Sequence, residues 1–313
     1  MVRLPVAAAL VLGVLVASPG LTGALTTAQT ATFRGGIDLV NVGVTVSDRR
    51  GAYLADLTAA DFEILEDGRP QAITYFVRGD QAPSALDTHV GLLFATSGSM
   101  NDDIALARSA AVRFLNTLSD AKDMTLVDFD TEVRISRYGQ RDFPRMVERI
   151  RRRRPDGFTA MYDALGVYLD RASEDEGRTI LVLYTDGGDT RSAIGFGDVM
   201  TLVRASNVTI YTVGFLEHQS ASMRVEQRAR LFQLADATGG QAFFPATMKD
   251  VEAAYDKIVA QVRAQYSLGY ASTNLKQDGS WRKVEIRVTR PGARDLRLQN
   301  RKGYFAPFKP GGG

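Results

Sequence analysis

The strongest constraint on the fold is a series of short, continuous apolar runs. They read HVGLLFA, MTLVDFD, TILVLYT and VTIYTVGF, and they begin at residues 89, 124, 179 and 208. Runs of this length without polar alternation are typical of strands that are buried on both faces of a parallel sheet. Segments with helical spacing of apolar residues occur at 104–118, 160–172, 228–237 and 250–262. This alternation predicts a doubly wound α/β domain, with a mostly parallel, Rossmann-like sheet and helices on both faces.

Both flanks of this region show instead the two-residue period of half-buried strands. Valines alternate with polar or small residues over 40–46, and DFEILEDGRPQAITYFV predicts two strands joined by a tight turn at Asp67-Gly68. The period returns after residue 265, in QYSLGYAS, WRKVEIRVT and LRLQNRKGYFAP. Because each flank is short, we predict that the two flanks form one small β-sandwich into which the α/β domain is inserted.

The N-terminus has the pattern of a secretory signal peptide. Arg3 precedes an apolar run at 6–16, and small and polar residues follow it. This run is well short of the roughly 20 apolar residues that a transmembrane helix requires. We therefore expect an exported protein, periplasmic or secreted, with no transmembrane anchor after signal removal. The expected divisions are a signal peptide at 1–28, a β segment at 36–80, the α/β domain at 86–263, a β segment at 264–307 and a disordered tail at 308–313.

Composition argues against several classes of function. The chain has no cysteine and only two histidines, and neither Ser97 nor Ser99 lies in a G-x-S-x-G motif. Its 38 basic residues nearly balance its 36 acidic ones, so the overall charge does not point to a nucleic-acid partner. We predict a non-enzymatic protein with no catalytic residues and no nucleic acid partner.

Four candidate site residues follow the predicted strands or precede a predicted helix. Ser97 and Ser99 come after the first strand, Thr159 lies in DGFTAMYDAL, and Asp186 lies in LYTDGGDT. Open α/β sheets place their ligands at the carboxyl ends of their strands, so these residues are expected to converge there. Hydroxyl and carboxylate oxygens are the ligands that Mg²⁺ prefers. The sequence therefore indicates a site for metal or partner binding at this edge of the sheet.

This constellation resembles the von Willebrand factor A-type domain. That family has a metal-ion-dependent adhesion site written D-x-S-x-S, with a distant Thr and a distant Asp, and Ser97, Ser99, Thr159 and Asp186 match it. Both flanks are similar to those of the exported, largely acidobacterial group of von Willebrand factor A-related proteins. The resemblance implies a central sheet with a metal at its top, whose coordination shell an acidic residue of a partner protein completes.

One position departs from the family pattern. Ala95 stands where the resemblance places the first aspartate, which leaves Asp186 beside neutral hydroxyl groups. We expect a weakened or lost metal site, with no cofactor or with weakly bound Mg²⁺. Tight binding, a weak site completed by a partner carboxylate, and a metal-free interaction domain all stay open. Asp189, Asp102 or Asp103 would compensate if it reached the site, but their spacing fits a helix N-terminus at least as well.

The run RIRRRRPDG at 149–157 leads directly into the Thr159 loop. One interpretation is a solvated helix end, where cations oppose the negative end of the helix dipole. The other is that Arg151, Arg152, Arg153 and Arg154 ring the binding face and attract an acidic partner through fork-like carboxylate contacts. The run has no interleaved aromatic residues on which bases would stack, which again disfavours nucleic acid.

Together these features predict a protein–protein interaction or adhesion module with an unknown protein partner. A structural envelope scaffold is one alternative. A metal-dependent hydrolase that uses Asp186 is another, but it requires a general base, and the sequence places none beside Asp186.

Overall fold

The computed structural model describes residues 39–79, 87–96, 104–154 and 156–309. The predicted signal peptide, Ser97, Ser99, Asp102 and Asp103 lie outside these residues. Within them, no helix is both long enough and apolar enough to cross a membrane.

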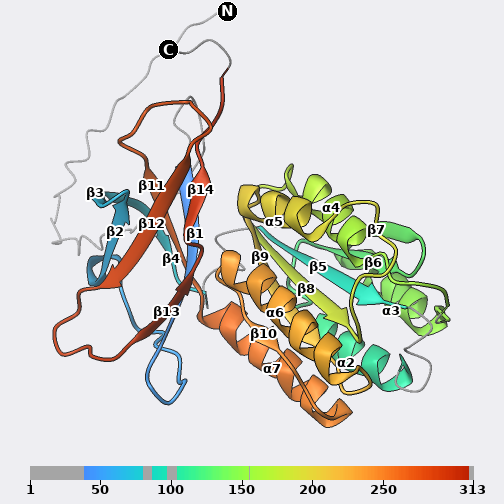
Figure 1. Cartoon of the computed structure of the whole chain (residues 1–313). Helices are drawn as coiled ribbons and strands as arrows, with labels where there is room; N and C mark the ends of the chain where they lie inside the picture. The colour runs from blue at the N-terminus through green and yellow to red at the C-terminus, as the bar shows by residue number, and fades with distance from the viewer. Residues whose placement is uncertain (1–38, 80–86, 97–103, 155, 310–313) are drawn as a thin grey trace, which may run out of the picture. The chain divides into compact units, whose positions relative to one another are not determined.

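A six-stranded sheet forms the centre of the region between residues 88 and 264 (Figure 1). Its strand order is β10-β9-β8-β5-β6-β7, and all neighbouring strands are parallel except the β6–β7 pair. The strands are β5 (Thr88–Ala95), β6 (Asp123–Phe129), β7 (Val133–Gly139), β8 (Arg178–Thr185), β9 (Val208–Gly214) and β10 (Ala242–Phe243). Each predicted apolar run forms one of these strands, so the predicted mostly parallel sheet is confirmed.

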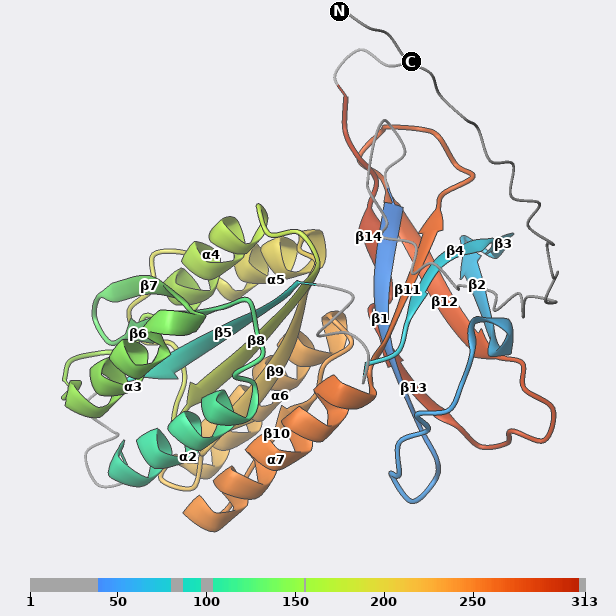
Figure 2. The ribbon, with the colours of Figure 1, turned by 180° about the vertical axis from the view of Figure 1, so that it is seen from behind.

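Helices cover both faces of this sheet. They are α2 (Ile104–Thr117), α3 (Phe143–Arg152), α4 (Met161–Ala172), α5 (Phe196–Ala205), α6 (Ala221–Ala237) and α7 (Met248–Ala264), and short 3₁₀ turns lie at Ala59–Asp61 and Gln140–Asp142. Figures 1 and 2 show α4 and α5 on one face, with α2 and α7 on the other. Side chains of successive β5 residues lie on opposite faces of the sheet. Leu92 and Phe94 pack with α2 and α7, whereas Leu93 and Ala95 pack with α4.

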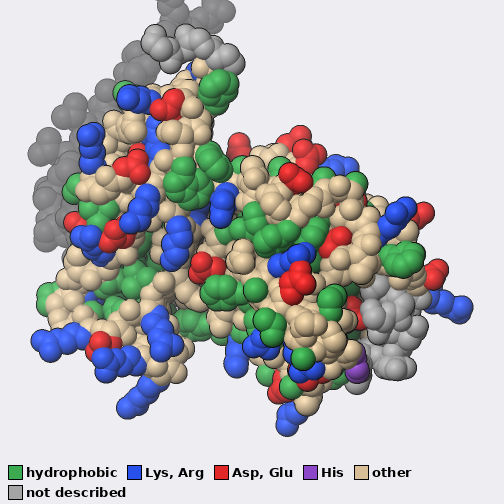
Figure 3. All heavy atoms as spheres, viewed as in Figure 1, with side chains coloured by type: hydrophobic (Ala, Val, Ile, Leu, Met, Phe, Trp, Pro, Cys, Tyr) green, Lys and Arg blue, Asp and Glu red, His purple; other side chains and the backbone are tan. Residues whose placement is uncertain are grey.

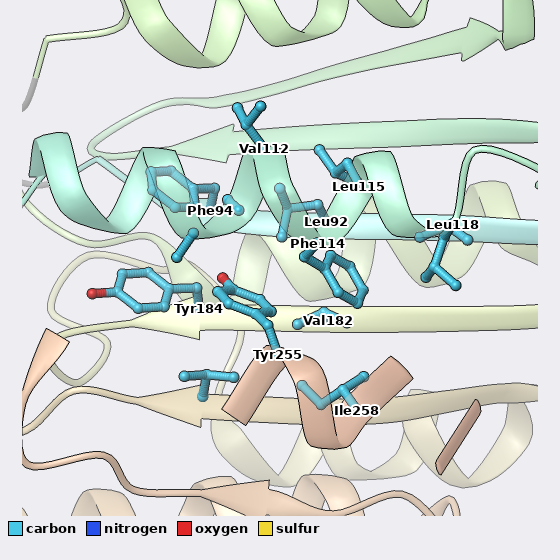
Figure 4. Packing of buried hydrophobic residues seen from close by; sticks show 14 of the residues in the cluster. Leu92, Phe94, Val112, Phe114, Leu115, Leu118, Val182, Tyr184, Tyr255 and Ile258 are labelled. Atoms are coloured by element: carbon cyan, nitrogen blue, oxygen red, sulfur yellow. The ribbon is translucent and has the colours of Figure 1, made fainter. Parts of the chain in front are cut away.

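Aromatic side chains fill the space between the sheet and helices α2 and α7 (Figure 4). The ring of Phe114 on α2 lies 5.1 Å from that of Tyr255 on α7, and Phe94 of β5 stacks on Tyr184 of β8 at 5.3 Å. All four side chains are buried. They hold α2 and α7 against the strands through apolar burial, which is the dominant favourable term in folding.

Some elements were not predicted from the sequence. Helices α3 and α5 and the edge strand β7 have no counterpart among the predicted segments, and α6 begins at Ala221 rather than at residue 228. The reason is clear for α3, because only Met146 and Ile150 of its ten residues are buried and arginines occupy much of the remainder. So few apolar positions give a weak helical period.

The two flanks form two four-stranded sheets, ordered β13-β1-β11-β4 and β14-β12-β2-β3. The strands are β1 (Leu39–Ser47), β2 (Phe62–Glu66), β3 (Arg69–Gln71), β4 (Ile73–Val77), β11 (Tyr266–Ala271), β12 (Trp281–Val288), β13 (Arg297–Asn300) and β14 (Gly303–Phe305). Each sheet contains strands from before and after the inserted domain, and their buried apolar side chains form one cluster. The prediction that the flanks share a sandwich is therefore confirmed.

Two local predictions for the flanks need correction. The turn at Asp67-Gly68 joins β2 to β3 with positive φ angles of 47° and 79° as expected, but the chain then passes to the other sheet, where β4 pairs with β11. The expected tail from residue 308 also begins too early. Phe308 bridges to Asp278, and the Lys309 N–H donates to Gln277 O at 3.1 Å, which extends the β12–β14 ladder.

A buried carboxylate connects both sheets of the sandwich. Glu66 of β2 is 2% exposed, and its carboxylate accepts hydrogen bonds from the hydroxyls of Tyr270, Tyr304 and Ser272 at 2.6 to 2.9 Å. Arg282 of β12, itself 1% exposed, approaches the same carboxylate at 3.3 Å. Burial alone would raise the pKa of Glu66, but the hydrogen bonds and the arginine outweigh it and hold that pKa below its usual value.

We predict that Glu66→Gln lowers the free energy of unfolding at neutral pH by about 3–5 kcal/mol, because Arg282 would stay buried without a counter-charge. The stability due to the lowered pKa of Glu66 is present above the unfolded carboxyl pKa of about 4.3 and is lost as the pH falls through the folded value. Urea denaturation should therefore show a larger difference between wild type and variant at pH 7 than in acid.

The matched control is Glu285→Gln on β12, where the carboxylate is 43% exposed and pairs with Arg287 at 2.8 Å. Exposed pairs contribute about 0–1 kcal/mol, so this change should be small at every pH. Equal costs for the two substitutions would contradict the role given to Glu66.

Candidate functional site

The structure brings the Thr159 loop and the Asp186 loop together. Asp186 directly follows β8 and is 3% exposed, and Thr159 precedes α4 and is 6% exposed. The Thr159 N–H donates to Thr190 Oγ1 at 3.0 Å, and Thr159 O accepts from the N–H groups of Thr190 and Arg191 at 2.9 and 3.2 Å. The two predicted site loops are thus joined by three hydrogen bonds, two of them between backbone groups.

The segment 156–160 is also bound to the ends of neighbouring strands. The N–H of Asp156 donates to Thr96 O at 2.9 Å, just after β5, and the N–H of Ala160 donates to Asp130 O at 2.8 Å, just after β6. The N–H of Phe158 donates to Thr131 Oγ1 at 3.0 Å. Phe158 is nevertheless 63% exposed. An aromatic side chain is therefore presented to solvent from a backbone that is fixed at the carboxyl edge of the sheet.

A glycine makes the close approach of this segment possible. Gly157 has a φ of +71°, and a side chain there would collide with Thr131 Oγ1. Only glycine adopts that backbone conformation without strain. The sequence G-F-T at 157–159 thus holds the loop against β6 while turning Phe158 outward.

Ala95 lies where the resemblance places an acid. It is the last residue of β5, it is fully buried, and it belongs to the apolar cluster that contains Phe129 and Met161. A carboxylate at this position would lose its hydration, at a cost that pairing with a cation would offset. The alanine therefore suits an apolar environment and supplies no metal ligand.

Two of the four candidate metal ligands, Thr159 and Asp186, lie among the described residues. They supply the Asp186 carboxylate and the Thr159 hydroxyl, whereas Mg²⁺ takes six oxygen ligands. No group of three or more acidic or imidazole side chains that could hold a metal occurs in the described part of the chain.

Asp189, considered as a substitute ligand, is engaged elsewhere. Its Oδ2 accepts hydrogen bonds from the Tyr162 N–H at 3.0 Å and from Ser192 Oγ at 2.5 Å, and its Oδ1 accepts from the Ser192 N–H at 3.1 Å. Tyr162 lies in the first turn of α4. The carboxylate thus satisfies a free N–H at the positive end of a helix, as one of the two sequence interpretations expected.

The arginine run divides into two groups. Arg149 and Arg153 bind carboxylates at the end of β6: Arg149 pairs with Asp128 at 2.8 Å, and Arg153 pairs with Asp130 at 2.5 Å. Arg134 of β7 contacts both aspartates, at 2.7 and 2.5 Å. Burial would raise the pKa of Asp130, but hydrogen bonds from Arg134, the Glu132 backbone and Arg153 hold it below its usual value.

Sequence reasoning did not identify Asp128 and Asp130 as site residues. They lie in VDFDTEV, where the strand spacing of the aromatics drew attention to the core. A detectable signal was present, because two acids two residues apart at a strand end are followed by a basic run. Recognising the pairing also required α3, which carries Arg149 to Asp128.

The other arginines of the run face solvent. Arg151 and Arg152, in the last turn of α3, each approach Glu148 at 3.5 Å, with side chains that are 61% and 83% exposed. Arg152, Arg153 and Arg154 line an open groove of about 540 Å³ that continues to Asp156. Figure 3 shows basic and acidic side chains next to one another over the end of the domain where α3 lies. The exposed arginines thus lie just before Phe158 in the chain, at the start of the loop that carries it.

Several solved structures resemble this fold. The von Willebrand factor type A protein from Catenulispora acidiphila has a TM-score of 0.50 and 13% identity over 89% of this chain and 76% of that chain. The pilus adhesin SpaC from Lactobacillus rhamnosus GG, in its open conformation, has a TM-score of 0.50 and 10% identity over 79% of this chain and 48% of that one.

The PilB minor pilin from Streptococcus sanguinis has a TM-score of 0.47 and 13% identity over 57% of this chain. The present chain spans 62% of the length of that pilin. At these identities the likenesses concern the fold alone.

A search of curated proteins found no similar sequence. The family model of the von Willebrand factor type A domain matches residues 89–257, which include the strands of the central sheet except for Thr88, the first residue of β5. The chain belongs to the von Willebrand factor type A domain family.

Proposed function

We propose that this chain is an exported, non-enzymatic adhesion module that binds a protein partner at the carboxyl edge of its central sheet. The observation that carries the proposal is the fixed segment 156–160, whose backbone hydrogen bonds to the ends of β5 and β6 hold Phe158 in solvent. A loop that is already ordered loses less entropy on binding, so its contacts convert more fully into affinity.

The chemistry of this edge favours a particular kind of partner. Phe158 offers an aromatic anchor of the type enriched at interface centres. Arg152 and Arg154 are exposed nearby, and a guanidinium group suits bidentate contact with a carboxylate. We therefore propose that the partner surface combines an apolar pocket with acidic residues around it. Thr159 is buried within this loop, and Asp186 is buried in the neighbouring loop that is hydrogen-bonded to it.

The fold is shared with the pilus adhesin SpaC, and we extend protein-mediated adhesion to this chain as part of the proposal. Export rests on the signal-like segment at 1–28. Periplasmic and secreted locations both agree with it.

We propose that metal has at most a weak role at this edge. Ala95 removes one negative charge that would balance a dication, and Asp189 is committed to the start of α4. A partner carboxylate would then meet arginine side chains in place of a tightly held cation. Weakly bound Mg²⁺, completed by the partner carboxylate, is the alternative within the same mechanism.

Calorimetric titration with Mg²⁺ and Mn²⁺ tests this view of the metal. We expect Ala95→Asp to bind these ions at least tenfold more tightly than the wild type, because the variant restores the missing carboxylate. Without metal it should melt at a lower temperature, since the new charge is buried in an apolar cluster, and metal should restore the loss.

The matched control is Ala95→Asn. Asparagine has nearly the same shape as aspartate but no charge, so this variant should gain no metal affinity. Asp186→Asn in the Ala95→Asp background should abolish the gain. Equally tight binding by the wild type and Ala95→Asp would contradict a weakened site and return metal-dependent adhesion to first place.

Selection of peptides from a random library displayed on phage tests the binding surface. We expect wild-type protein to enrich sequences that combine acidic and apolar residues. Phe158→Ala, and Arg152→Glu combined with Arg154→Glu, should each weaken binding of the selected peptides at least tenfold. Arg49→Glu is the control, because this arginine is 73% exposed on the sandwich and should not matter. Peptides that bind all variants equally would contradict the proposed surface.

A further inference from the structure

Three arginines are buried among the described residues, and one of them differs from the others. Arg282 pairs with Glu66. Arg301 donates three hydrogen bonds, to Asn207 Oδ1 at 2.6 Å, to Gly303 O at 2.9 Å and to Arg204 O at 3.2 Å. Arg178, at the start of β8, is 7% exposed and donates a single side-chain hydrogen bond, to Val262 O. Within the described residues, no carboxylate lies at ion-pair distance from Arg178, and its buried Nε has no hydrogen-bond partner.

This arrangement is energetically unfavourable for the protein alone. A buried cation without a counter-charge loses its hydration and gains no ion pair in return. Burial lowers the pKa of Arg178 to about 10, which reflects the same loss of hydration. The bond to Val262 caps the carboxyl end of α7, but it uses only one of five guanidinium N–H groups. A cap alone therefore does not account for an arginine at this position.

Arg178 lies in the wall of a pocket of about 280 Å³ at the amino ends of the strands. Leu118 after α2, Ala121 before β6 and Val262 of α7 give this pocket apolar walls, and Thr88 at the start of β5 adds a hydroxyl group. Leu118 belongs to the same apolar cluster as Phe114 (Figure 4). The pocket thus combines one buried positive charge with an apolar lining, as small-molecule sites commonly do.

We infer that this pocket binds a small monocarboxylate, whose carboxylate pairs with Arg178 and whose apolar tail lies against Leu118, Ala121 and Val262. A planar guanidinium matches a carboxylate with two parallel hydrogen bonds. One buried cation balances one negative charge, and the exposed Asp120 on the rim repels every anion, those of higher charge more strongly. The site lies at the amino ends of the strands, so it is independent of the adhesion surface proposed at their carboxyl ends.

The test measures thermal stability and calorimetric binding of the purified chain with sodium acetate, butyrate, hexanoate and octanoate at constant ionic strength. We expect the melting temperature to rise with each salt, and affinity to increase with chain length until the pocket is filled. The corresponding neutral alcohols should have little effect, because they cannot pair with Arg178.

Variants locate the binding. Arg178→Met should weaken carboxylate binding at least tenfold, and without ligand it should melt no lower than the wild type, because it replaces an unpaired buried cation with an apolar chain. Arg113→Met is the matched control, since this arginine of α2 is 59% exposed, pairs with Glu252 at 3.2 Å, does not line the pocket and should leave binding unchanged. Ala121→Leu narrows the pocket without altering Arg178, and it should weaken the binding of octanoate more than the binding of acetate.

Failure of every carboxylate to bind would overturn the inference, as would equal binding by wild type and Arg178→Met. Stabilisation by inorganic phosphate but by no carboxylate would overturn the assigned ligand class. If Arg178→Met does not fold, the Ala121→Leu comparison decides, and equal losses for acetate and octanoate would count against the pocket. None of these outcomes bears on the variants of Phe158 or Arg152.

Discussion

The pairing of β4 with β11 is the constraint on which the rest of the structure depends. These strands lie on either side of the inserted domain, and Val77 is registered opposite Ser267. Bringing residues so distant in sequence together costs loop-closure entropy when the chain between them is flexible. The α/β domain removes that cost by holding the start of β5 and the end of α7 in place. The stability of the sandwich therefore depends on the inserted domain as well as on the strands of the sandwich.

Pairing of buried charge is a second theme of the structure. Glu66 is matched by Arg282, and Asp128 and Asp130 are matched by arginines of α3 and β7. At the amino edge of the sheet, Arg137 contacts both Asp123 and Asp175, at 2.6 and 2.7 Å, next to the buried His89. Because an unpaired buried charge is costly, these pairs fix the positions of the strands that carry them.

The buried Arg301 donates its hydrogen bonds to three uncharged oxygens and has no carboxylate partner among the described residues. Two further departures from this theme, at Ala95 and Arg178, are related to ligands in our proposals. Ala95 removes a charge where the family resemblance places one, and we propose that the carboxyl edge therefore uses arginine and aromatic contacts rather than a tightly bound cation. Arg178 keeps a buried charge without a carboxylate at ion-pair distance in the described part of the chain. The first departure concerns the proposed partner surface, and the second concerns a pocket at the opposite ends of the strands.

The sequence predicted the sheet well, because strands buried on both faces leave uninterrupted apolar runs. It predicted the shared sandwich from the two-residue period of both flanks. It did not predict α3, whose exposed arginines mask a short apolar stripe, and so the pairing of Arg149 with Asp128 was not foreseen. Nor did it indicate that Arg178 is buried with one hydrogen bond, since that depends on how α7 ends above β8.

The most direct test of the adhesion surface is photo-crosslinking in the native cells. A photoreactive phenylalanine analogue would replace Phe158 in one variant and, as a control, Phe232 on the outer side of α6, which is 56% exposed. The account predicts that position 158 crosslinks to one defined protein, and that charge reversal at Arg152 and Arg154 abolishes the product. Crosslinking from position 232 alone, or a product at 158 that survives the charge reversal, would contradict recognition at the carboxyl edge of the sheet.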